Sequence, residues 1–190
     1  MAIDIVEIGH PVLREIATAV SPELLASAEV QQFIDELIDT KRVANGAGIA
    51  ANQVDNTWRI FVVEVASNPR YPYKPEYPLT VMVNPEITFE SDERFDNFEG
   101  CLSIPNLRGV VSRCPEIRVR GLDRHGEALD FEVKGISAGT FQHELDHLDG
   151  ILFPDRVEDT RTLCTWNEFS TRYEDAFKLQ VERIVSRYGS

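Results

Sequence analysis

The sequence predicts an α+β fold, with a central helix surrounded by antiparallel β-strands, one helix near the N-terminus and a long helix at the C-terminus. Apolar residues recur at helical spacing in residues 30–38, 136–148 and 169–188. Strand-like patterns cluster between residues 59 and 133. Because strands and helices do not alternate regularly, a doubly wound sheet is not favoured. The length of 190 residues fits a single domain that spans 1–190.

Three segments are predicted to be helical. Residues 28–43 carry an apolar face, and Ser21-Pro22 upstream is typical of an earlier turn or helix start. Residues 136–148 can form a second helix, which Gly150 follows in the position of a C-terminal cap. From Asn167 onward, an apolar stripe predicts a long amphipathic helix that packs on the body of the protein. The stripe consists of Phe169, Tyr173, Phe177, Val181, Ile184 and Tyr188.

Strands are predicted where β-branched and apolar residues run together or alternate with polar ones. Asn84-Pro85 interrupts one such run, so two strand pieces are expected there. A turn at residues 123–126 joins two alternating segments, and together they are typical of a hairpin. The predicted strands are residues 59–65, 80–83, 86–89, 116–123 and 129–133, with a further short piece at 151–157.

A proline-rich segment separates the first two of these strands. Pro69, Pro72, Pro75 and Pro78 have a period of three, which matches polyproline II. The segment could dock on a partner that reads proline. We favour the interpretation that it is an extended surface loop.

Composition excludes several classes of function. Lys and Arg number 19 and Asp and Glu 32, a formal charge of -13, which disfavours direct nucleic-acid binding and anionic membranes. No apolar run approaches the ~20 residues of a membrane span, and no targeting segment is visible, so a cytoplasmic protein is expected. Cys101, Cys114 and Cys164 are odd in number, which argues against a disulfide framework. His10 and His125 stand alone, and ordinary surface roles are predicted for both.

The sharpest chemical signal is the segment His143-Glu144-Leu145-Asp146-His147. On a helix, residues four apart lie on one face, so both imidazoles can reach one metal ion. Glu144 lies beside the first imidazole, where it can take and return the proton of a metal-activated water. The central helix is therefore predicted to bind a catalytic metal.

Two histidines do not complete such a site, because catalytic centres of this kind usually have three protein ligands. Downstream, Glu158 and Glu168 are possible ligands. Upstream, Cys101 lies within residues 99–103, and a thiolate is a strong ligand for late divalent metals. A cysteine on its own is more often a core residue than a ligand, so the residues alone leave the third ligand open.

A glycine-rich segment, residues 46–53, ends in Gln53. Its glycine spacing fits neither a phosphate loop nor a dinucleotide fingerprint. Small residues let a substrate backbone approach closely, and a glutamine amide can donate to a developing oxyanion. Taken alone, the segment is more typical of a tight packing turn.

These three segments, in this order, resemble the signature motifs of the peptide deformylase family. That family carries Gly-x-Gly-hydrophobic-Ala-Ala-x-Gln, Glu-Gly-Cys-Leu-Ser and Gln-His-Glu-x-Asp-His, which here are residues 46–53, 99–103 and 142–147. Residues 8–14 and 148–155 are also similar to family segments. The resemblance therefore covers most of the chain through about residue 157.

The resemblance implies a metal-dependent hydrolase that removes the N-formyl group from formylmethionyl nascent polypeptides and releases formate. It implies that Cys101, His143 and His147 hold the metal and that Glu144 is the general base and then the general acid, with a metal-bound water as nucleophile. The native metal implied is Fe(II), although the donor set also suits zinc, nickel or cobalt.

Further roles follow from the same resemblance. Gln53 and the backbone N–H of Leu102 would stabilise the oxyanion. The backbone around Gly48, Ile49 and Gly100 would align the substrate peptide as an added strand. The implied partner is the formylated peptide, and the C-terminal helix could make a transient contact with the ribosome.

The chain departs from the family where the side-chain pocket is lined. Gly139 and Thr140 lie about one turn before His143, where larger residues are common, and Asp55 replaces a frequent glycine. The smaller residues predict a pocket that tolerates bulkier first side chains, such as phenylalanine.

Two other functions compete with this prediction. A metallopeptidase that cuts internal peptide bonds would use a downstream His or Glu ligand and would not need Cys101. A catalytically inactive relative would only bind N-termini. The presence of Glu144, Gln53 and the three candidate ligands in one chain argues against the inactive relative.

Overall fold

The computed structural model describes residues 2–66 and 73–190. Within these residues, seven strands form two antiparallel sheets, one with the strand order β1-β2-β3-β6-β7 and one made of β4 and β5. The strands are β1 (Gly48–Ala50), β2 (Ile60–Val65), β3 (Tyr77–Glu90), β4 (Phe95–Cys101), β5 (Ile104–Arg113), β6 (Glu116–Leu122) and β7 (Ala128–Lys134).

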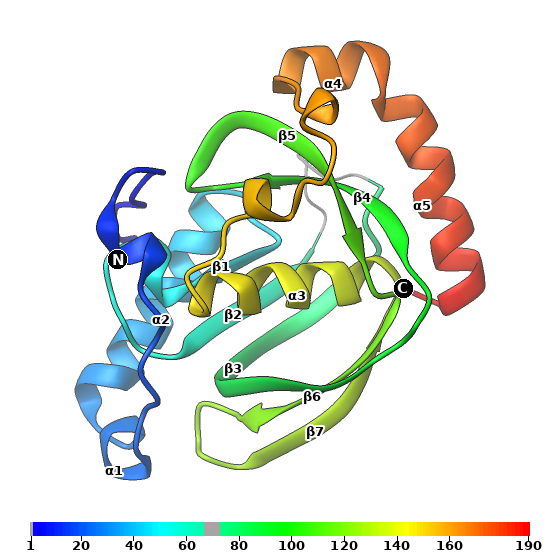
Figure 1. Cartoon of the computed structure of the whole chain (residues 1–190). Helices are drawn as coiled ribbons and strands as arrows, with labels where there is room; N and C mark the ends of the chain where they lie inside the picture. Colours follow the sequence, from blue (N-terminus) through cyan, green and yellow to red (C-terminus); the bar gives the residue numbers. More distant parts are fainter. Residues whose placement is uncertain (1, 67–72) are drawn as a thin grey trace.

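A central helix, α3, lies between the two sheets, while α4 and α5 run along the outside of β4 and β5 (Figure 1). The mixed architecture and the antiparallel strands around a central helix confirm the predicted α+β fold. The α-helices are α1 (Pro22–Leu25), α2 (Ala28–Val43), α3 (Gly135–Leu148), α4 (Trp166–Arg172) and α5 (Glu174–Tyr188), and the 3-10 helices are η1 (Pro11–Arg14), η2 (Ala51–Val54), η3 (Phe153–Arg156) and η4 (Thr160–Thr162).

The amphipathic patterns explain the N-terminal helix α2 and the central helix α3. Ser27 caps α2 by accepting a hydrogen bond from Val30 N, and the apolar face of α2 packs in a core cluster with β2 and β3. In α3, Ala138, Phe141 and Leu148 pack against the five-stranded sheet. This packing leaves the opposite side of α3 facing β4, where its histidines lie.

The strand β3 is continuous, which corrects the predicted break at Asn84-Pro85. Asn84 adopts φ 50°, and the register with β6 shifts between Val83 and Glu86. Asn84 also accepts from Val20 N and donates to Val20 O, at 2.8 Å in each case. The proline is therefore accommodated in a bulge, where its missing N–H costs no ladder bond.

The short strand predicted at 151–157 is wrong, because this segment contains η3. Pro154 has no N–H to donate to a sheet, and its fixed φ suits the first turn of a helix. Asp155 accepts from Leu152 N at 2.8 Å, which closes the turn. Phe153 is buried, so the apolar residues of the segment serve the core without a strand.

The predicted C-terminal helix is present but is interrupted at Tyr173, where α4 ends and α5 begins. The rings of Phe169, Tyr173 and Phe177 all lie within 5.7 Å of the Phe98 ring on β4, measured between centroids. The change of direction lets both helices contact the same residue. The apolar stripe packs on the body as predicted.

The hairpin of β6 and β7 is confirmed, whereas β1, β4 and β5 were not predicted. The polyproline pattern was predicted to begin at Pro69, and Pro69 and Pro72 lie outside the described residues. Residues 73–76 are irregular, and β3 begins at Tyr77.

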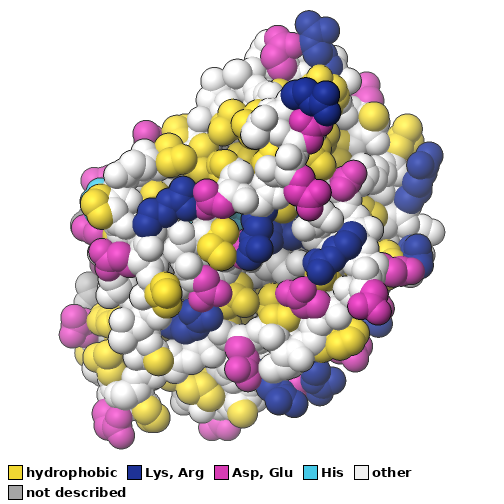
Figure 2. Space-filling model, viewed as in Figure 1, with side chains coloured by type: hydrophobic (Ala, Val, Ile, Leu, Met, Phe, Trp, Pro, Cys, Tyr) yellow, Lys and Arg dark blue, Asp and Glu magenta, His cyan; other side chains and the backbone are white. Residues whose placement is uncertain are grey.

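Among the described helices, none is long and apolar enough to cross a membrane. Figure 2 shows acidic and basic side chains interspersed on one face, with hydrophobic side chains gathered between β5 and α4.

Candidate metal centre

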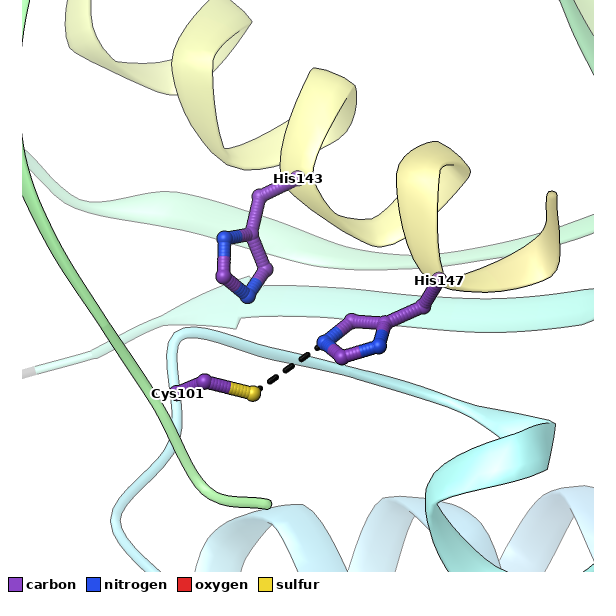
Figure 3. Close-up of side chains that lie close together, drawn as sticks. All are labelled: Cys101, His143 and His147. Atoms are coloured by element: carbon purple, nitrogen blue, oxygen red, sulfur yellow. Dashed lines mark hydrogen bonds between the residues drawn. The ribbon is translucent and has the colours of Figure 1, made fainter. Parts of the chain in front are cut away.

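Three side chains of metal-ligating type converge between α3 and the end of β4. His143 and His147 lie one turn apart on α3, and both side chains point toward Cys101, the last residue of β4 (Figure 3). Their ligand atoms all lie within 4.8 Å of one another. Cys101 Sγ is 3.1 Å from His147 Nε2, and the two imidazole rings have centroids 5.0 Å apart. The cluster brings together all three predicted ligands.

The chemistry of this donor set fits a late first-row divalent metal. One thiol and two imidazoles are ligands for iron, cobalt, nickel and zinc. Burial lowers the pKa of His147 well below its ordinary value, which keeps the imidazole in the neutral form that binds metals. Burial also lowers the pKa of His143, but hydrogen bonds with Cys101 and Glu99 outweigh it and raise that pKa well above normal. The Cys101 and Glu99 side chains therefore stabilise positive charge on this side of the cluster.

A buried carboxylate lies behind the first histidine. Glu99 Oε2 is 2.9 Å from His143 Nδ1, an arrangement that fixes the ring and directs Nε2 toward the cluster. Arg113 donates to both oxygens of Glu99, at 2.7 and 3.0 Å, and to Asp146 at 2.7 Å. Burial alone raises the pKa of Glu99, but Arg113 and His143 hold it well below its ordinary value. Arg156 completes the network by donating to Asp146 Oδ1 at 2.7 Å.

Glu144 lies in the same cavity and is buried. Burial raises the pKa of this carboxyl group to about 7. Within the described residues, Glu144 Oε2 has no hydrogen-bond partner. The backbone of β1 passes directly against the carboxylate, because a Cβ on Gly48 would lie 2.3 Å from Glu144 Oε1. Any side chain at position 48 would therefore displace the side chain of Glu144.

The amide of Gln53 also faces the cluster. Gln53 Oε1 accepts from Ala50 N at 2.9 Å, which fixes the side chain, while Nε2 donates to Ser103 Oγ at 3.1 Å and Cys101 Sγ at 3.4 Å. Leu102 follows Cys101 in the turn between β4 and β5 and lines the same cavity. Both residues predicted to stabilise an oxyanion thus lie beside the ligand cluster.

The residues predicted to align a peptide belong to strand segments on either side of the cavity. Gly48 and Ile49 are in β1, which is an edge strand of the five-stranded sheet. Gly100 is in β4, immediately before Cys101. An edge strand can pair with an added strand through main-chain hydrogen bonds.

The cavity continues past the cluster to a polar wall. Its lining includes Lys74, Asn97, Arg108 and Thr140. Lys74 Nζ donates to Thr140 Oγ1 at 3.1 Å, and burial lowers the pKa of the amine to about 8. The guanidinium of Arg108 lies 4.5 Å from the Trp166 ring centroid and 3.9 Å from that of Phe169.

Gly139 does not widen this cavity, contrary to the expectation from its small size. A Cβ on Gly139 would lie 3.2 Å from Phe95 Cζ and 3.3 Å from Asn97 Nδ2. The space that a larger residue would fill is thus already occupied by side chains of β4. The remaining cavity has a volume of about 40 Å³.

The other candidate ligands lie elsewhere. The cluster does not include Glu158 or Glu168, the downstream alternatives. His10 is exposed and accepts from Val12 N at 3.4 Å at the start of η1, while His125 is exposed in the turn before β7. Both have the surface positions predicted for them.

Sequence reasoning missed the supporting residues of the site. Glu99 was noted only as part of a motif, and Arg113, Lys74 and Arg108 were not considered. A signal for Glu99 is its position two residues before Cys101 on one strand, because side chains two apart share a face. Arg113 gives no comparable signal, because only the pairing of β4 with β5 brings it to Glu99.

Known proteins are similar to this chain in sequence and in fold. A family model described as "Polypeptide deformylase" matches residues 2–162. "Peptide deformylase 2" from Nostoc sp. is 45% identical over 165 residues, which are 87% of this chain and 91% of that protein. The family match includes every described strand and α3, whereas α4 and α5 lie beyond it.

Solved structures extend the comparison. A class I type b peptide deformylase from Acinetobacter baumannii, with Met-Ala-Ser bound, has a TM-score of 0.80 and 41% identity, and the match covers 83% of this chain and 99% of that one. A peptide deformylase from Legionella pneumophila has a TM-score of 0.75 and 26% identity, with 98% of this chain and 95% of that one covered.

Proposed function

Since the chain belongs to the peptide deformylase family, we propose that it hydrolyses the N-formyl amide of formylmethionyl nascent polypeptides and releases formate. The observation that carries this proposal is the convergence of Cys101, His143 and His147 beside the buried carboxylate of Glu144 in one cavity. A solved relative with Met-Ala-Ser bound, a peptide that begins with methionine, supports the same class of ligand.

Cys101, His143 and His147 would hold the metal. A divalent transition metal at this position supplies Lewis-acid activation of water near neutral pH. Fe(II) is the native metal that the family resemblance implies, with zinc, nickel and cobalt as metals that the same donors can hold. Metal analysis of protein purified without air tests this part of the proposal.

Glu144 is the proposed general base and then the general acid. Its carboxylate takes a proton from the attacking water and returns it to the nitrogen of the departing peptide. The neighbouring backbone of Gly48 leaves no room for a side chain, so the carboxylate is held close to β1. Holding the Glu144 carboxylate in a fixed position at the reacting bond contributes more to the rate than its proton affinity alone.

Two donors are proposed to stabilise the tetrahedral oxyanion. Gln53 is held through its Oε1 contact with Ala50 N, and its Nε2 faces Cys101. The backbone N–H of Leu102 is the second donor. Because the fold fixes the positions of both donors before substrate binds, neither donor has to reorganise during the reaction.

The peptide is proposed to bind as an added strand along β1. Gly48 and Ile49 would supply main-chain hydrogen bonds on one side and Gly100 on the other. The Trp166 ring borders Gly100, because a Cβ on Gly100 would lie 3.4 Å from Trp166 Cζ2. Main-chain recognition suits an enzyme whose substrates differ beyond the first residue.

We further propose that residues 1–190 act as one catalytic domain in the cytoplasm, where nascent chains emerge. The outer face of α5, which bears Leu179 in an exposed position, is the proposed surface for a transient ribosome contact. Pelleting with ribosomes, compared between the protein and a Leu179→Ser variant, tests that contact.

The decisive experiment measures formate release from formyl-Met-Ala-Ser by protein purified without air. The protein should release formate rapidly, and Glu144→Gln should lose several orders of magnitude in kcat/KM with its metal retained. Glu158→Gln, which changes a glutamate outside the cluster, is the matched control and should keep full activity. A fully metallated protein that releases no formate but cuts internal peptide bonds would be the competing metallopeptidase.

A further inference from the structure

The side chain of Trp166, in the helix α4, borders the strand β4 next to the metal cluster. A Cβ on Gly100 would lie 3.4 Å from Trp166 Cζ2. The indole is half-buried and lines an open depression in the surface. The other residues that line this depression are Cys101, Leu102, Pro105 and Asn106. Trp166 lies beyond residues 2–162, which the family model matches, so the family motifs do not contain this side chain.

Backbone and ring contacts hold Trp166 in place beside β5. Cys164 N donates to Arg108 O at 2.9 Å, and Arg108 N donates to Cys164 O at 2.8 Å. Trp166 N donates to Asn106 Oδ1 at 3.3 Å. The indole also has the Arg108 guanidinium 4.5 Å from its centroid and the Phe169 ring centroid at 6.3 Å. Because the fold already positions the indole, a ligand that packs on it would lose little affinity to ordering this side chain.

The alternation of side chains along β4 defines two faces beside the peptide site. Glu99 and Cys101 face α3, where Glu99 contacts His143 and Cys101 joins the metal cluster. Phe98 and Gly100 face the opposite way, toward α4. A peptide that adds a strand between β1 and β4 would continue the same two faces, because its own side chains also alternate.

This alternation decides which residue of the peptide meets the indole. The formyl group is bonded to the nitrogen of the first residue, so the first side chain lies close to the metal cluster and enters the cavity beside α3. The second side chain then points to the α4 face. Gly100 has no side chain on that face, and the Trp166 ring is the neighbouring group.

Resting on the proposed deformylase function, we propose that Trp166 makes this enzyme prefer formyl peptides whose second side chain is aromatic or long and apolar. Among the described residues, no acidic or basic side chain lines the depression. Figure 2 shows hydrophobic side chains gathered in the same region, between β5 and α4. An aromatic side chain would bury apolar surface there and pack on the indole. A carboxylate would lose water without gaining an ion pair.

The test compares formyl peptides that differ only in the second side chain. The series is formyl-Met-X-Ser, with X as alanine, leucine, phenylalanine or aspartate. The readout is the ratio of kcat/KM for each peptide to that for alanine, in the wild-type protein, Trp166→Ala, Trp166→Phe and Trp58→Ala. Each ratio comes from one sample, so it does not depend on the fraction of protein that is folded and metallated. Trp58 is the other tryptophan of the chain and lies outside both linings, so it is the matched control.

In the wild-type protein, phenylalanine and leucine should exceed alanine by about three- to tenfold, the effect of one ring contact with its buried area. Aspartate should not exceed alanine. Trp166→Ala should bring the phenylalanine ratio to within about twofold of one. Trp166→Phe should keep part of the preference, because it keeps a ring at this position, and Trp58→Ala should leave the ratios unchanged.

Fluorescence provides a second readout that needs no hydrolysis. In Trp58→Phe, Trp166 is the sole tryptophan, because the chain contains two. Titration with the product peptide Met-Phe-Ser should shift the Trp166 emission to shorter wavelength, since the second side chain covers the indole. Met-Ala-Ser should cause a smaller shift at saturation.

Equal cleavage of the alanine and phenylalanine peptides by the wild-type protein would overturn the inference. A phenylalanine preference that persists in Trp166→Ala would overturn it as well, and so would an emission that Met-Phe-Ser does not change. In these cases, release of formate from formyl-Met-Ala-Ser would leave the proposed deformylase function intact. If metallated protein cleaves no formyl peptide, the proposed function fails, while the fluorescence titration still decides whether Trp166 contacts the second side chain.

Discussion

Gly48 and Glu144 are in direct contact, since a Cβ on residue 48 would lie only 2.3 Å from Glu144 Oε1. The carboxylate proposed as the general base and the edge strand proposed to hold the substrate are thus packed tightly against one another. A shift in either one would move the proposed general base relative to the scissile bond.

Gly48→Ala should therefore reduce kcat/KM by about 100-fold, because displacements of about 1 Å at a reacting group can have this effect. The atoms nearest to the added methyl group all belong to Glu144 and none to the Cys101, His143 and His147 cluster, so metal content should stay unchanged. Kinetics with formyl-Met-Ala-Ser and metal analysis of the same sample check both statements. Full activity in Gly48→Ala would mean that the carboxylate is free to move.

Cys101→Ala should lose tightly bound metal and with it the activity, because two histidines alone make a weaker and incomplete site. Cys164→Ala removes a thiol outside the cluster and is the matched control. Metal content after gel filtration distinguishes the two variants. Retention of metal and activity by Cys101→Ala would favour the metallopeptidase with a downstream ligand.

Arg113→Gln should destabilise the protein by about 3–5 kcal/mol, because it leaves the buried Glu99 and Asp146 without their shared partner. Metal affinity should also fall by about 10–100-fold, since Glu99 orients His143. Urea unfolding and metal competition measure the two effects. Arg118→Gln, which breaks an exposed pair with Asp130, should change neither.

Glu64 should make stability dependent on pH. Hydrogen bonding to Arg42, with a further contribution from Lys41, outweighs burial and lowers the pKa of Glu64 to about 2. The folded-state pKa is below the unfolded value, so the stabilisation is complete above the unfolded pKa and is lost as pH falls through about 2. Glu64→Gln should therefore be less stable than wild type by about 1–2 kcal/mol at pH 7.

That difference should shrink when unfolding of the two proteins is compared at pH 3. An equal difference in stability between wild type and Glu64→Gln at pH 7 and at pH 3 would show that folding does not shift the pKa of the Glu64 carboxylate.

If the native metal is Fe(II), activity should decay in air as the iron or the Cys101 thiolate is oxidised. A zinc-loaded sample of the same protein should lose activity more slowly, because zinc has no redox chemistry and only the thiolate can then be oxidised. Parallel activity measurements over hours in air and in nitrogen decide the matter. An iron-loaded sample that stays fully active in air would contradict the prediction.

Local patterns predicted the parts of the fold that depend on local physics. The helix Ala28–Val43 was predicted with its bounds, because its apolar spacing lies within the segment itself and its cap, Ser27, immediately precedes it. The hairpin of β6 and β7 was predicted from alternation for the same reason. In contrast, β4 and β5 bury Asn97, Glu99 and Arg113, polar residues that pair with each other only after folding. Their sequence therefore lacks the apolar alternation of a half-buried strand.

The candidate site shows the same division. Spacing on a helix predicted that His143 and His147 share a face, and the structure brings Cys101 to them. No spacing rule connects Glu99 with Arg113, 14 residues apart, or Lys74 with Thr140, 66 residues apart. Those contacts exist only because strand pairing and the position of α3 bring distant segments together.

The ligands of the cluster come from two separate layers, since Cys101 ends a strand of the small sheet and both histidines belong to the helix packed on the large one. A metal bound by all three residues would cross-link the two layers, and its binding energy would add to the free energy of unfolding. Each tenfold rise in free metal above the dissociation constant would then add about 1.4 kcal/mol of stability. A shortage of the metal would thus lower the stability of the folded chain as well as its catalytic activity.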